Sequence, residues 1–367
     1  MDEPYHGASV ALRNLVQRLR TDFAVDVVGP RASGNPAGGP DVSNSLIGIR
    51  YLVSSVLGAL RFQARQATLP RSERSRLVVA YDVYLAGVSA IWARVTGTPF
   101  VYLPLDSDRV VSQGFVKGGY AGGSARRWLR GPNERMALRT ADLVVVLSPF
   151  MRQELVKDGI PERRVMVVGV KRPAPRRDPV AVAEWRRRLK LEGRTGVIFL
   201  GSFRYPPNVQ AFQFLREMVR SSFPFRPDGP QFVVAGFDSE GYADVTIPNL
   251  TVVGSVSDLD GLLEACDVAV APMDVQGGTS LKMIDYVLHG LRVVATPEAT
   301  AGVAASPLIH TVARERFVEG LHAVLDEAGR SPRLDPDPSY LSLYVGSDDL
   351  REFVESARRL IDRHAGR

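Results

Sequence analysis

Short apolar runs alternate with amphipathic stretches along most of the 367-residue chain, and this alternation constrains the fold more than any other feature. Consecutive β-branched and apolar positions are typical of strands buried on both faces of a parallel sheet. In the first half they predict strands at Ala24–Val28, Leu77–Ala80, Phe100–Leu103, Leu143–Leu147 and Val165–Val168. Helices are predicted at Ala8–Leu19, Leu85–Arg94, Arg126–Arg139 and Pro149–Lys157. This order indicates an α/β domain whose parallel sheet is covered by helices.

The alternation stops at Lys171–Val180 and then resumes. Three prolines and four basic residues in this segment predict a linker between two domains, because they sustain neither helix nor sheet. Beyond it, strands are predicted at Val197–Leu200, Phe232–Ala235, Leu250–Val253, Val268–Ala271 and Val293–Ala295. Helices are predicted at Asn208–Val219, Leu259–Ala265, Thr279–Leu288 and Arg314–Ala328.

We therefore predict a first domain over residues 1–172, a second over 173–346, and a final amphipathic helix over 347–367 that returns to the first domain. The first domain lacks the opening strand that normally precedes a glycine-bearing turn such as YHGAS. Either the chain starts upstream, or another arrangement compensates for the unpaired backbone of a missing strand.

Charge is unevenly distributed. Residues 1–170 carry 22 Lys and Arg against 14 Asp and Glu, whereas residues 171–367 carry 24 against 26. The basic half indicates an anionic partner, such as a membrane surface or a phosphorylated acceptor, or else an arginine-rich composition without functional meaning. No base-reading helix or stacking aromatic platform accompanies the charge, so we expect no nucleic-acid partner.

The remaining composition predicts a cytoplasmic protein. The single cysteine, Cys266, can form neither an intrachain disulfide nor a zinc site by itself. No run approaches the roughly 20 apolar residues of a membrane span. The N-terminal MDEPYHG has neither the basic start nor the apolar centre of a signal peptide.

The strongest chemical signal is the segment Gly277–Thr296, which follows one predicted strand and ends in the next. Gly277 and Gly278 allow close approach of a ligand to the backbone at a helix start, where N–H groups and the dipole attract phosphate. Thr279 or Ser280 can cap the helix. Lys282 follows on nearly the same helix face, where its ammonium can neutralise a diphosphate. One turn later, Asp285 could accept hydrogen bonds from ribose hydroxyls.

Taken alone, this segment is equally consistent with an ordinary amphipathic helix whose Leu281, Ile284 and Leu288 face the core. Its context favours the nucleotide site. Together with it, the chain contains in order VIFLGSFRYPPN at 197–208, FVVAGF at 232–237, TVVGSVSDL at 251–259 and ACDVAVAP at 265–272.

This order resembles the C-terminal domain of the retaining glycosyltransferases of family 4, which have the GT-B fold. Upstream, ERMALRTADLVVVLSPFMRQELVKDGIPERRVMVVGV at 134–170 and GASVALRNLVQRL at 7–19 resemble the family's first domain, as VTGTPFVYLPLDSD at 95–108 does more loosely. The likeness extends over about 90% of the chain and implies two Rossmann-like domains facing across a cleft.

The resemblance implies roles for individual residues. Lys282 matches the lysine that holds the donor diphosphate, and Asp285 stands where the family usually has a ribose-binding glutamate. Gly277 replaces a second glutamate that addresses the donor sugar, which leaves the sugar's identity open. Arg204 lies near the place of a diphosphate-binding arginine, although a surface position is the competing interpretation. The resemblance also assigns Ser202, Gly254 and Ser255 to loops that face the donor.

Three further positions are assigned to the first domain. Gly7 and Ala8 would bring backbone amides near the distal phosphate, and His6 would contact the acceptor or the sugar. Asp106 lies in a loop where such enzymes often place an acceptor- or sugar-binding group, commonly a histidine. A solvated turn is the competing interpretation of Asp106.

The resemblance implies transfer of a hexose from a nucleotide-diphosphate sugar to a hydroxyl acceptor with retention of configuration. The donor is a UDP-sugar by default, and no cofactor is expected. No Asp-x-Asp pair stands beside a donor strand, so no metal site is expected either; Asp106–Asp108 has the spacing but lies in the other domain. Catalysis would rest on positioning and on electrostatic stabilisation of the leaving diphosphate.

Several alternatives remain open. The basic stretch at 125–139 with Trp128, together with the apolar segment 45–62, would suit a peripheral membrane contact or, equally, core packing with a solvated face. A nucleotide-sugar 2-epimerase shares the double-Rossmann fold, but no matching acid–base histidine motif is present. A degenerate, non-catalytic homologue that binds nucleotide or partners an active transferase is the main competing function.

Overall fold

The computed structural model describes residues 16, 19–25, 61, 64–66, 68–70, 74–81, 83–104, 123–203, 205–244, 246–275, 278–330, 334–346 and 350–365. Two compact units divide the chain. The described residues between 16 and 170 and between 350 and 365 form the N-terminal unit, and those between 171 and 346 form the C-terminal unit. Each unit is built on its own parallel sheet, which confirms the predicted α/β fold class.

The sheet of the N-terminal unit has four described strands in the order β1-β2-β3-β4. They are β1 (Val78–Ala80), β2 (Phe100–Tyr102), β3 (Leu143–Val146) and β4 (Val165–Val167), all parallel. The accompanying helices are α3 (Val83–Thr96), α5 (Gly123–Thr140), α6 (Pro149–Lys157), the 3₁₀ turn η2 (Glu162–Arg164) and α14 (Arg351–Ala365). Of the predicted strand Ala24–Val28, only Ala24 and Val25 are described, and most of the helix Ala8–Leu19 lies outside the described residues.

The two central strands of this sheet, β2 and β3, are buried along their length, as their apolar runs predict. Along β2, Phe100 and Tyr102 pack into a cluster with residues of α3, α5 and α6, whereas the intervening Val101 packs on the opposite face. There it meets Phe353 and Val354 of α14. Because strand side chains alternate, two helical layers are needed to cover the sheet, and the C-terminal helix supplies part of the second.

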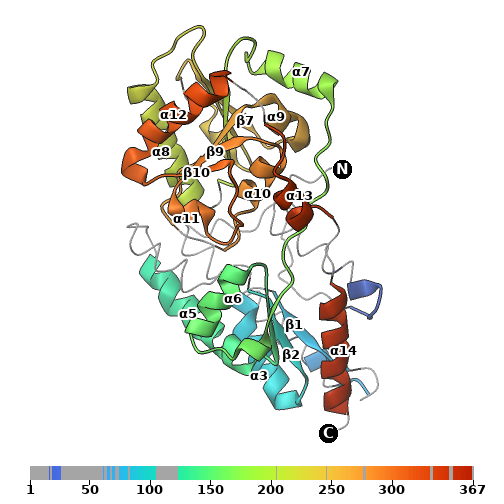
Figure 1. Ribbon diagram of the computed structural model, residues 1–367. Helices are drawn as coiled ribbons and strands as arrows, with labels where there is room; N and C mark the ends of the chain where they lie inside the picture. Colours follow the sequence, from blue (N-terminus) through green and yellow to red (C-terminus); the bar gives the residue numbers. More distant parts are fainter. Residues whose placement is uncertain are drawn as a thin grey trace. The chain divides into compact units, whose positions relative to one another are not determined.

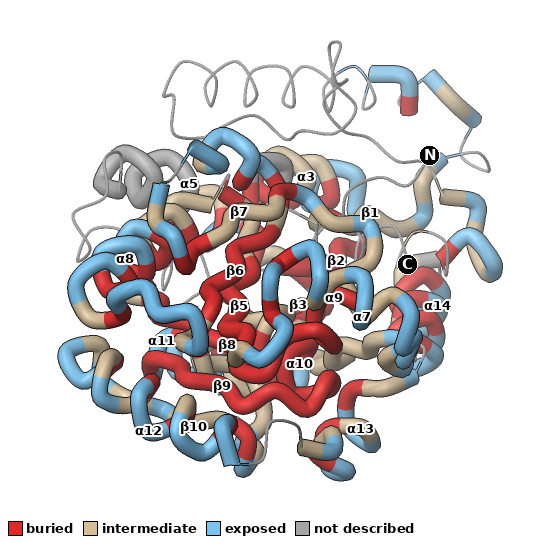
Figure 2. The backbone as a smooth tube through the Cα atoms, turned by 90° about the horizontal axis from the view of Figure 1, so that it is seen from above, coloured by how far each residue is buried: buried red, intermediate tan, exposed pale blue. Residues whose placement is uncertain are grey.

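The described part of the C-terminal unit contains six parallel strands in the order β10-β9-β8-β5-β6-β7. They are β5 (Gly196–Leu200), β6 (Gln231–Ala235), β7 (Leu250–Gly254), β8 (Val268–Ala271), β9 (Arg292–Ala295) and β10 (Ile309–Thr311). The central strands are buried along their length, whereas the surrounding helices expose their outer faces (Figure 2).

The helical elements of this unit are α7 (Pro179–Arg188), α8 (Pro206–Ser222), η3 (Ser239–Tyr242), α9 (Leu259–Ala265), α10 (Leu281–Leu288), α11 (Pro297–Thr300), η4 (Arg314–Arg316), α12 (Phe317–Arg330) and α13 (Pro338–Tyr344). In Figure 1, α8 and α12 lie on one side of the sheet, while α9 and α10 lie on the other. Phe214 and Phe317 join α8 to α12, with ring centroids 5.8 Å apart.

The predicted linker Lys171–Val180 is wrong at its C-terminal end, where α7 begins at Pro179. Proline is unfavourable inside a helix but suits its first position, because the missing N–H has no intrahelical partner there. Asp178 caps the helix by accepting hydrogen bonds from the N–H groups of Val180 at 2.9 Å and Ala181 at 3.3 Å. The sequence Asp-Pro is therefore a helix start.

Residues 171–178, which precede α7, are called the connector. The start of the connector is hydrogen-bonded to the end of α13. The Arg172 N–H donates to the Tyr344 carbonyl at 2.7 Å, and the Gly346 N–H donates to the Arg172 carbonyl at 3.0 Å. These bonds attach Arg172 to the C-terminal unit. The compact units accordingly divide between residues 170 and 171, two positions before the boundary expected from the sequence.

Three glycines bring the ends of neighbouring strands close together in the C-terminal unit. Gly201 follows β5, Gly236 follows β6, and Gly254 ends β7. The Gly236 N–H donates to the Gly254 carbonyl at 2.9 Å. Gly236 has φ +141, and a Cβ at this position would collide with the Gly201 carbonyl oxygen. The backbone is therefore compact at the carboxyl edge of the sheet.

Gly236→Ala is expected to lower the free energy of unfolding by more than about 2 kcal/mol, since strained backbone and overpacking each cost about 1–3 kcal/mol. Chemical denaturation measures the change. Gly241→Ala is the matched control in the same region, because a Cβ there meets no atom within 4 Å. Equal stability losses in the two variants would contradict the close approach of the backbone at Gly236.

Candidate nucleotide-diphosphate site

Chain order reverses between β5 and β8 in the C-terminal sheet. From β5 the chain proceeds to β6 and β7 on one side, and it returns to β8, β9 and β10 on the other. β5 and β8 pair directly, with Val197 opposite Val268 and Ile198 opposite Ala269. In open α/β sheets, ligands bind outside the carboxyl ends of the strands at such a topological switch point. The candidate site is therefore where the loops after β5 and β8 meet.

Lys282 and Asn208 join the two sides of this switch point. Lys282 lies in α10, after β8, and Asn208 lies in the first turn of α8, after β5. The Lys282 ammonium donates to Asn208 Oδ1 at 2.8 Å, and Asn208 Nδ2 donates to the Ser202 carbonyl at 2.9 Å. The predicted diphosphate-binding lysine is thus placed at the switch point.

The ammonium of Lys282 lies in a largely apolar environment. It is 3.5 Å from Met273 Sδ and 4.7 Å from the centroid of the Phe199 ring. Burial lowers its pKa to about 7. No carboxylate of the described residues forms an ion pair with Lys282, so a bound anion would supply its counter-charge.

Two hydroxyl groups of the predicted site are buried, one in each of the two loops at the switch point. Ser202 Oγ in the loop after β5 and Thr279 Oγ1 in the loop after β8 make no hydrogen bond to any described residue. Buried polar groups are normally hydrogen-bonded, and leaving one unpaired costs about 1–3 kcal/mol. Ser202 and Thr279 therefore carry unsatisfied buried hydroxyls in the two loops of the switch point.

Helix α10 begins at Leu281, two residues after the predicted start at Thr279. Ser280 is the N-cap residue with extended backbone, φ −78 and ψ 94, but its side chain makes no capping hydrogen bond. The capping role expected of Thr279 or Ser280 is therefore wrong for the side chains, because no first-turn N–H is hydrogen-bonded to them. First-turn N–H groups have no carbonyl partner four residues earlier, which makes a helix start suitable for an anion.

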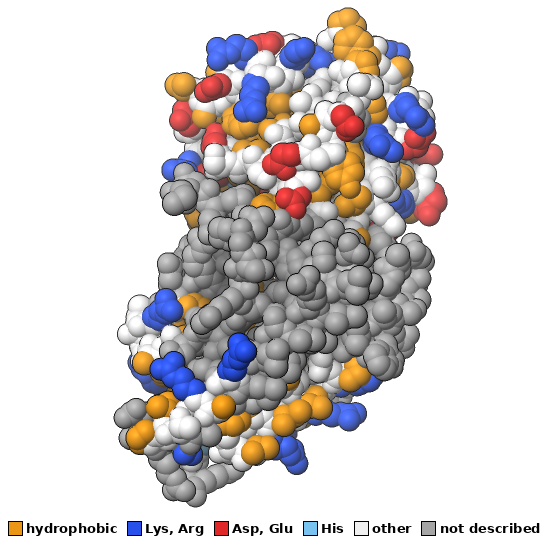
Figure 3. Space-filling model, turned by 180° about the vertical axis from the view of Figure 1, so that it is seen from behind, with side chains coloured by type: hydrophobic (Ala, Val, Ile, Leu, Met, Phe, Trp, Pro, Cys, Tyr) orange, Lys and Arg blue, Asp and Glu red, His pale blue; other side chains and the backbone are white. Residues whose placement is uncertain are grey.

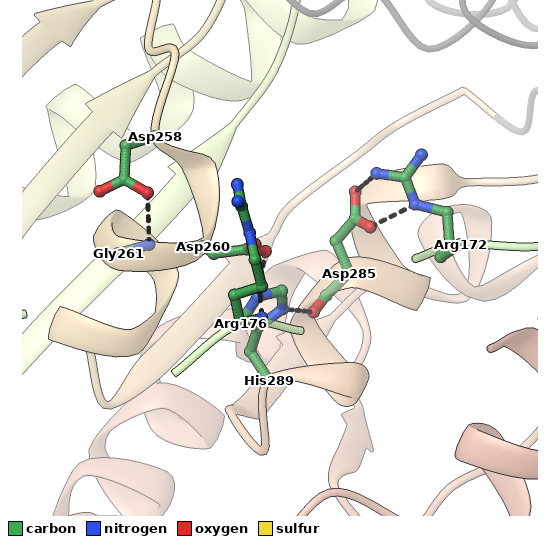
Figure 4. A network of polar contacts seen from close by, with 7 residues as sticks. All are labelled: Arg172, Arg176, Asp258, Asp260, Gly261, Asp285 and His289. Carbon is green, nitrogen blue, oxygen red and sulfur yellow. Dashed lines mark hydrogen bonds and ion pairs between the residues drawn. The ribbon is translucent and has the colours of Figure 1, made fainter. Parts of the chain in front are cut away.

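Asp285 forms a buried ion pair that sequence reasoning missed. Arg172 Nε donates to Asp285 Oδ1 at 2.7 Å, and its terminal amino group donates to Oδ2 at 3.0 Å (Figure 4). The two side chains are 11% and 7% exposed. Burial raises the pKa of Asp285, and the Arg172 guanidinium counteracts this rise. A carboxylate accepts about four hydrogen bonds, so the predicted ribose contact would have to share Asp285 with Arg172.

A second side-chain network holds the C-terminal end of α10. His289 Nδ1 lies 2.7 Å from the Asp285 carbonyl oxygen, and Nε2 lies 3.0 Å from Asp260 Oδ1. The hydrogen bond with His289 lowers the pKa of Asp260. Arg176 Nε is 3.5 Å from Asp260 Oδ2, but its side chain is 88% exposed. The helix that carries Lys282 is therefore fixed by side chains from both the connector and α9.

The predicted residues Gly254 and Ser255 lie at the end of β7 and at the start of the loop that follows it. Gly254 has φ +91, a conformation that L side chains rarely adopt. The Ser255 N–H donates to Glu240 Oε1 at 2.6 Å. Partial burial raises the pKa of Glu240, but its hydrogen bonds with Ser255 outweigh that effect and lower the pKa. Ser255 is thus oriented by a glutamate that the sequence alone did not single out.

Six predicted site positions lie outside the described residues: His6, Gly7, Ala8, Asp106, Arg204 and Gly277. Gly278 is described and precedes Thr279 in the loop before α10. Trp128 and the arginines beside it lie in α5. Only the backbone is described at these positions. The roles assigned to all these residues remain predictions.

Two family models match the chain in succession. Residues 6–171 match the glycosyl transferase 4-like domain, and residues 194–326 match the glycosyl transferases group 1. Together the two matches span about four-fifths of the sequence. The chain belongs to the group 1 glycosyltransferases. The family that the sequence motifs resemble is thereby confirmed.

The fold of this transferase is shared with solved GT-B structures. HepE from Anabaena, solved with UDP-glucose, aligns with a TM-score of 0.64 and 14% identity over 99% of this chain and 97% of that one. Sucrose-phosphate synthase from Thermosynechococcus elongatus aligns with a TM-score of 0.62 and 16% identity over 100% and 94%. WaaG, a glycosyltransferase involved in lipopolysaccharide biosynthesis, aligns at 0.59 and 13% over 98% and 96%. At these identities the likeness shows the fold alone.

No curated protein matches the transferase sequence. None of the helices in the described part of the chain combines the length and the apolar character that crossing a membrane requires.

Proposed function

We propose that this transferase moves a hexose from a nucleotide-diphosphate sugar to a hydroxyl acceptor with retention of configuration and without a metal. The observation that carries the proposal is the cationic Lys282 at the switch point between β5 and β8, where no described carboxylate neutralises it. A diphosphate is the ligand class that suits a lysine beside a helix start and a loop with a double glycine. HepE, which has the same fold, was solved with UDP-glucose, and this supports a UDP-sugar as the donor to test first.

In the proposed reaction the bond between the anomeric carbon and the diphosphate oxygen breaks, and a bond to the acceptor oxygen forms on the same face. The leaving diphosphate takes the proton of the acceptor hydroxyl. Lys282 stabilises the charge that develops on the diphosphate, and the amides before α10 assist. A charge-assisted contact of this kind contributes about 1.5–3 kcal/mol. Positioning and electrostatics would therefore supply most of the catalysis.

The remaining donor roles are part of the same proposal. Ser202, Thr279 and Ser280 would face the diphosphate, while Gly254 and Ser255 would face the base. Asp285 would accept from the ribose while it holds Arg172. Gly7, Ala8, His6, Arg204 and Asp106 keep the donor and acceptor roles that their sequence positions indicate.

We also propose a cytoplasmic enzyme whose acceptor is a glycan, a glycolipid or a natural product. The basic N-terminal unit supports a peripheral contact with the inner membrane face. Figure 3 displays Lys and Arg side chains among apolar ones on the described part of this unit. Binding to vesicles with and without anionic lipid would test this contact.

Calorimetric titration of UDP, GDP and dTDP without metal tests the nucleotide site. We expect one nucleotide to bind the wild-type protein, and we expect Lys282→Ala to lose that binding because the diphosphate loses its cation. The base that binds identifies the donor class. If a well-folded wild-type protein bound none of the three nucleotides, the competing interpretation of a non-catalytic partner would replace the transferase.

Retention can be tested on the donor alone. Slow hydrolysis of an α-linked nucleotide sugar should first release the α-anomer of the free sugar, which proton NMR distinguishes from the β-anomer. Initial release of the β-anomer would contradict a retaining reaction.

A further inference from the structure

Asn208 is a buried polar side chain that the sequence motifs did not single out for chemistry. It is the third residue of α8, after two prolines, and only 6% of its surface is exposed. Its backbone N–H donates to the Tyr205 carbonyl at 2.9 Å, which fixes the first turn of the helix. The side chain therefore starts from a rigid point beside the loop after β5.

The orientation of the Asn208 amide is set by the backbone of that loop. Nδ2 can only donate, and it donates to the Ser202 carbonyl at 2.9 Å. Oδ1 must then face the other way, where it accepts from Lys282 at 2.8 Å. A Cβ at Gly201 would lie 2.8 Å from Asn208 Cγ, so the loop approaches the amide as closely as glycine permits.

The other neighbours of the Lys282 ammonium cannot replace Asn208. Met273 offers a weakly accepting thioether at 3.5 Å, and Phe199 offers the face of its ring at 4.7 Å. Among the described residues, Asn208 supplies the oxygen that fixes where the ammonium lies. Because this oxygen is neutral, it directs the charge of the lysine without cancelling it.

We propose that Asn208 is a positioning residue of the nucleotide site, which holds the Lys282 ammonium between the loops after β5 and β8 while leaving its charge available to the donor diphosphate. This inference rests on the proposed function of Lys282. It adds that the asparagine side chain matters for its neutrality as well as its shape, so the near-isosteric but charged carboxylate introduced by Asn208→Asp would impair the site.

The other titratable side chains of α10 are engaged elsewhere. Asp285 pairs with Arg172, and the Tyr286 hydroxyl oxygen accepts from the Leu200 N–H at 2.7 Å. Burial is the cause of the low pKa of Lys282. A carboxylate in contact raises the pKa of a lysine, typically by about 1–3 units, whereas loss of the hydrogen-bond acceptor lowers it further. Asn208→Asp and Asn208→Leu should therefore move the Lys282 titration in opposite directions.

The first experiment needs no nucleotide. The rate of reductive methylation of Lys282, followed by mass spectrometry from pH 5.5 to 9.5, reports its deprotonated fraction. We expect a wild-type midpoint near pH 7, a rise of about one unit or more in Asn208→Asp, and a fall in Asn208→Leu. Unchanged midpoints in both variants would overturn the inference even if the protein binds nucleotide.

The second experiment measures affinity for the nucleotide that the wild type binds. At pH 7, Asn208→Asp should lose about tenfold or more, because the carboxylate competes with the diphosphate for Lys282. Asn208→Leu should lose more affinity at pH 8 than at pH 6, because its lower Lys282 midpoint makes reprotonation on binding more costly as pH rises. Wild-type affinity in Asn208→Asp would overturn the inference while leaving the transferase proposal intact.

Asn249→Leu is the matched control. Asn249 is also a buried asparagine, 2% exposed, and it donates to the Phe223 carbonyl at 2.9 Å. It stands at the amino end of β7, whereas the candidate site lies at the carboxyl ends of the strands. Its replacement should lower stability without moving the Lys282 midpoint. A midpoint shift in this control would show that general destabilisation, and not position, changes the lysine, and would overturn the inference.

Discussion

Arg172→Met is expected to lower the free energy of unfolding by about 3–5 kcal/mol, the cost of leaving one member of a buried ion pair without its partner. Asp285, only 7% exposed, loses both of its hydrogen bonds with the guanidinium in this variant. Chemical denaturation measures the loss. The double variant Arg172→Met with Asp285→Leu should recover most of it, because a buried ion pair can often be replaced by apolar residues at little cost.

Arg176→Met is the matched control for this prediction. Arg176 belongs to the same connector and also contacts a carboxylate, but its side chain is 88% exposed and the distance is 3.5 Å. An exposed pair of this kind contributes about 0–1 kcal/mol. Similar losses for Arg172→Met and Arg176→Met would contradict the structural importance of the buried pair.

The same double variant tests the ribose role of Asp285. If this carboxylate accepts from the ribose, the folded double variant should bind UDP more weakly than the wild type does, while its affinity for pyrophosphate stays unchanged. Equal affinities for UDP would instead assign Asp285 to the stability of the connector alone.

Lys282→Met is expected to weaken nucleotide-diphosphate binding by about 10–150-fold, the equivalent of one charge-assisted contact of about 1.5–3 kcal/mol. Binding to the wild type should also weaken as pH rises above about 7, because the buried ammonium deprotonates there and must regain its proton when the diphosphate binds. Calorimetry from pH 7 to 9 measures this dependence. The methionine variant should show no such slope.

Lys282→Met weakens binding, but it should raise the free energy of unfolding relative to the wild type at low pH. Between the folded pKa of about 7 and the ordinary value of 10.5, the unfolded chain binds more protons than the folded protein at Lys282. Wild-type stability therefore rises with pH across this window and is lowest below it. Lys282→Met lacks this dependence, so its stability relative to the wild type should be greater at pH 6.5 than at pH 9.5.

Lys157→Met provides the reference for these measurements, since Lys157 is 69% exposed and lies in α6 of the N-terminal unit. It should alter neither nucleotide affinity nor the pH dependence of stability. If the Lys282 variant kept wild-type affinity across pH 7–9, the lysine would have no role in holding a diphosphate.

Local sequence patterns predicted the elements that position the site. Buried parallel strands read as apolar β-branched runs because both of their faces are covered, so β5, β6, β8 and β9 were predicted to within a residue or two at each end. The segment around Lys282 was also predicted from local sequence, because it combines glycines, hydroxyl residues and a lysine at a helix start. Those residues act within one loop and one helix, and their spacing is visible in the chain.

Local sequence patterns did not predict the start of α7 or the presence of β10, for two different physical reasons. Prolines usually break helices, but Pro179 follows the cap residue Asp178 and starts one. Strand β10 has only three residues, and its pairing with β9 is what makes it a strand. Local composition decides neither whether three residues form a strand nor whether a proline breaks a helix or starts one.

The sequence by itself determined the fold class, the family and the lysine that faces the switch point. Only the tertiary structure placed Asn208 against Lys282, 74 residues away, and Arg172 against Asp285, 113 residues away. Such contacts depend on which strands are neighbours in the sheet and on how the connector returns to α10. Side-chain partners across the fold follow from strand order and packing, and no periodicity in the chain encodes them.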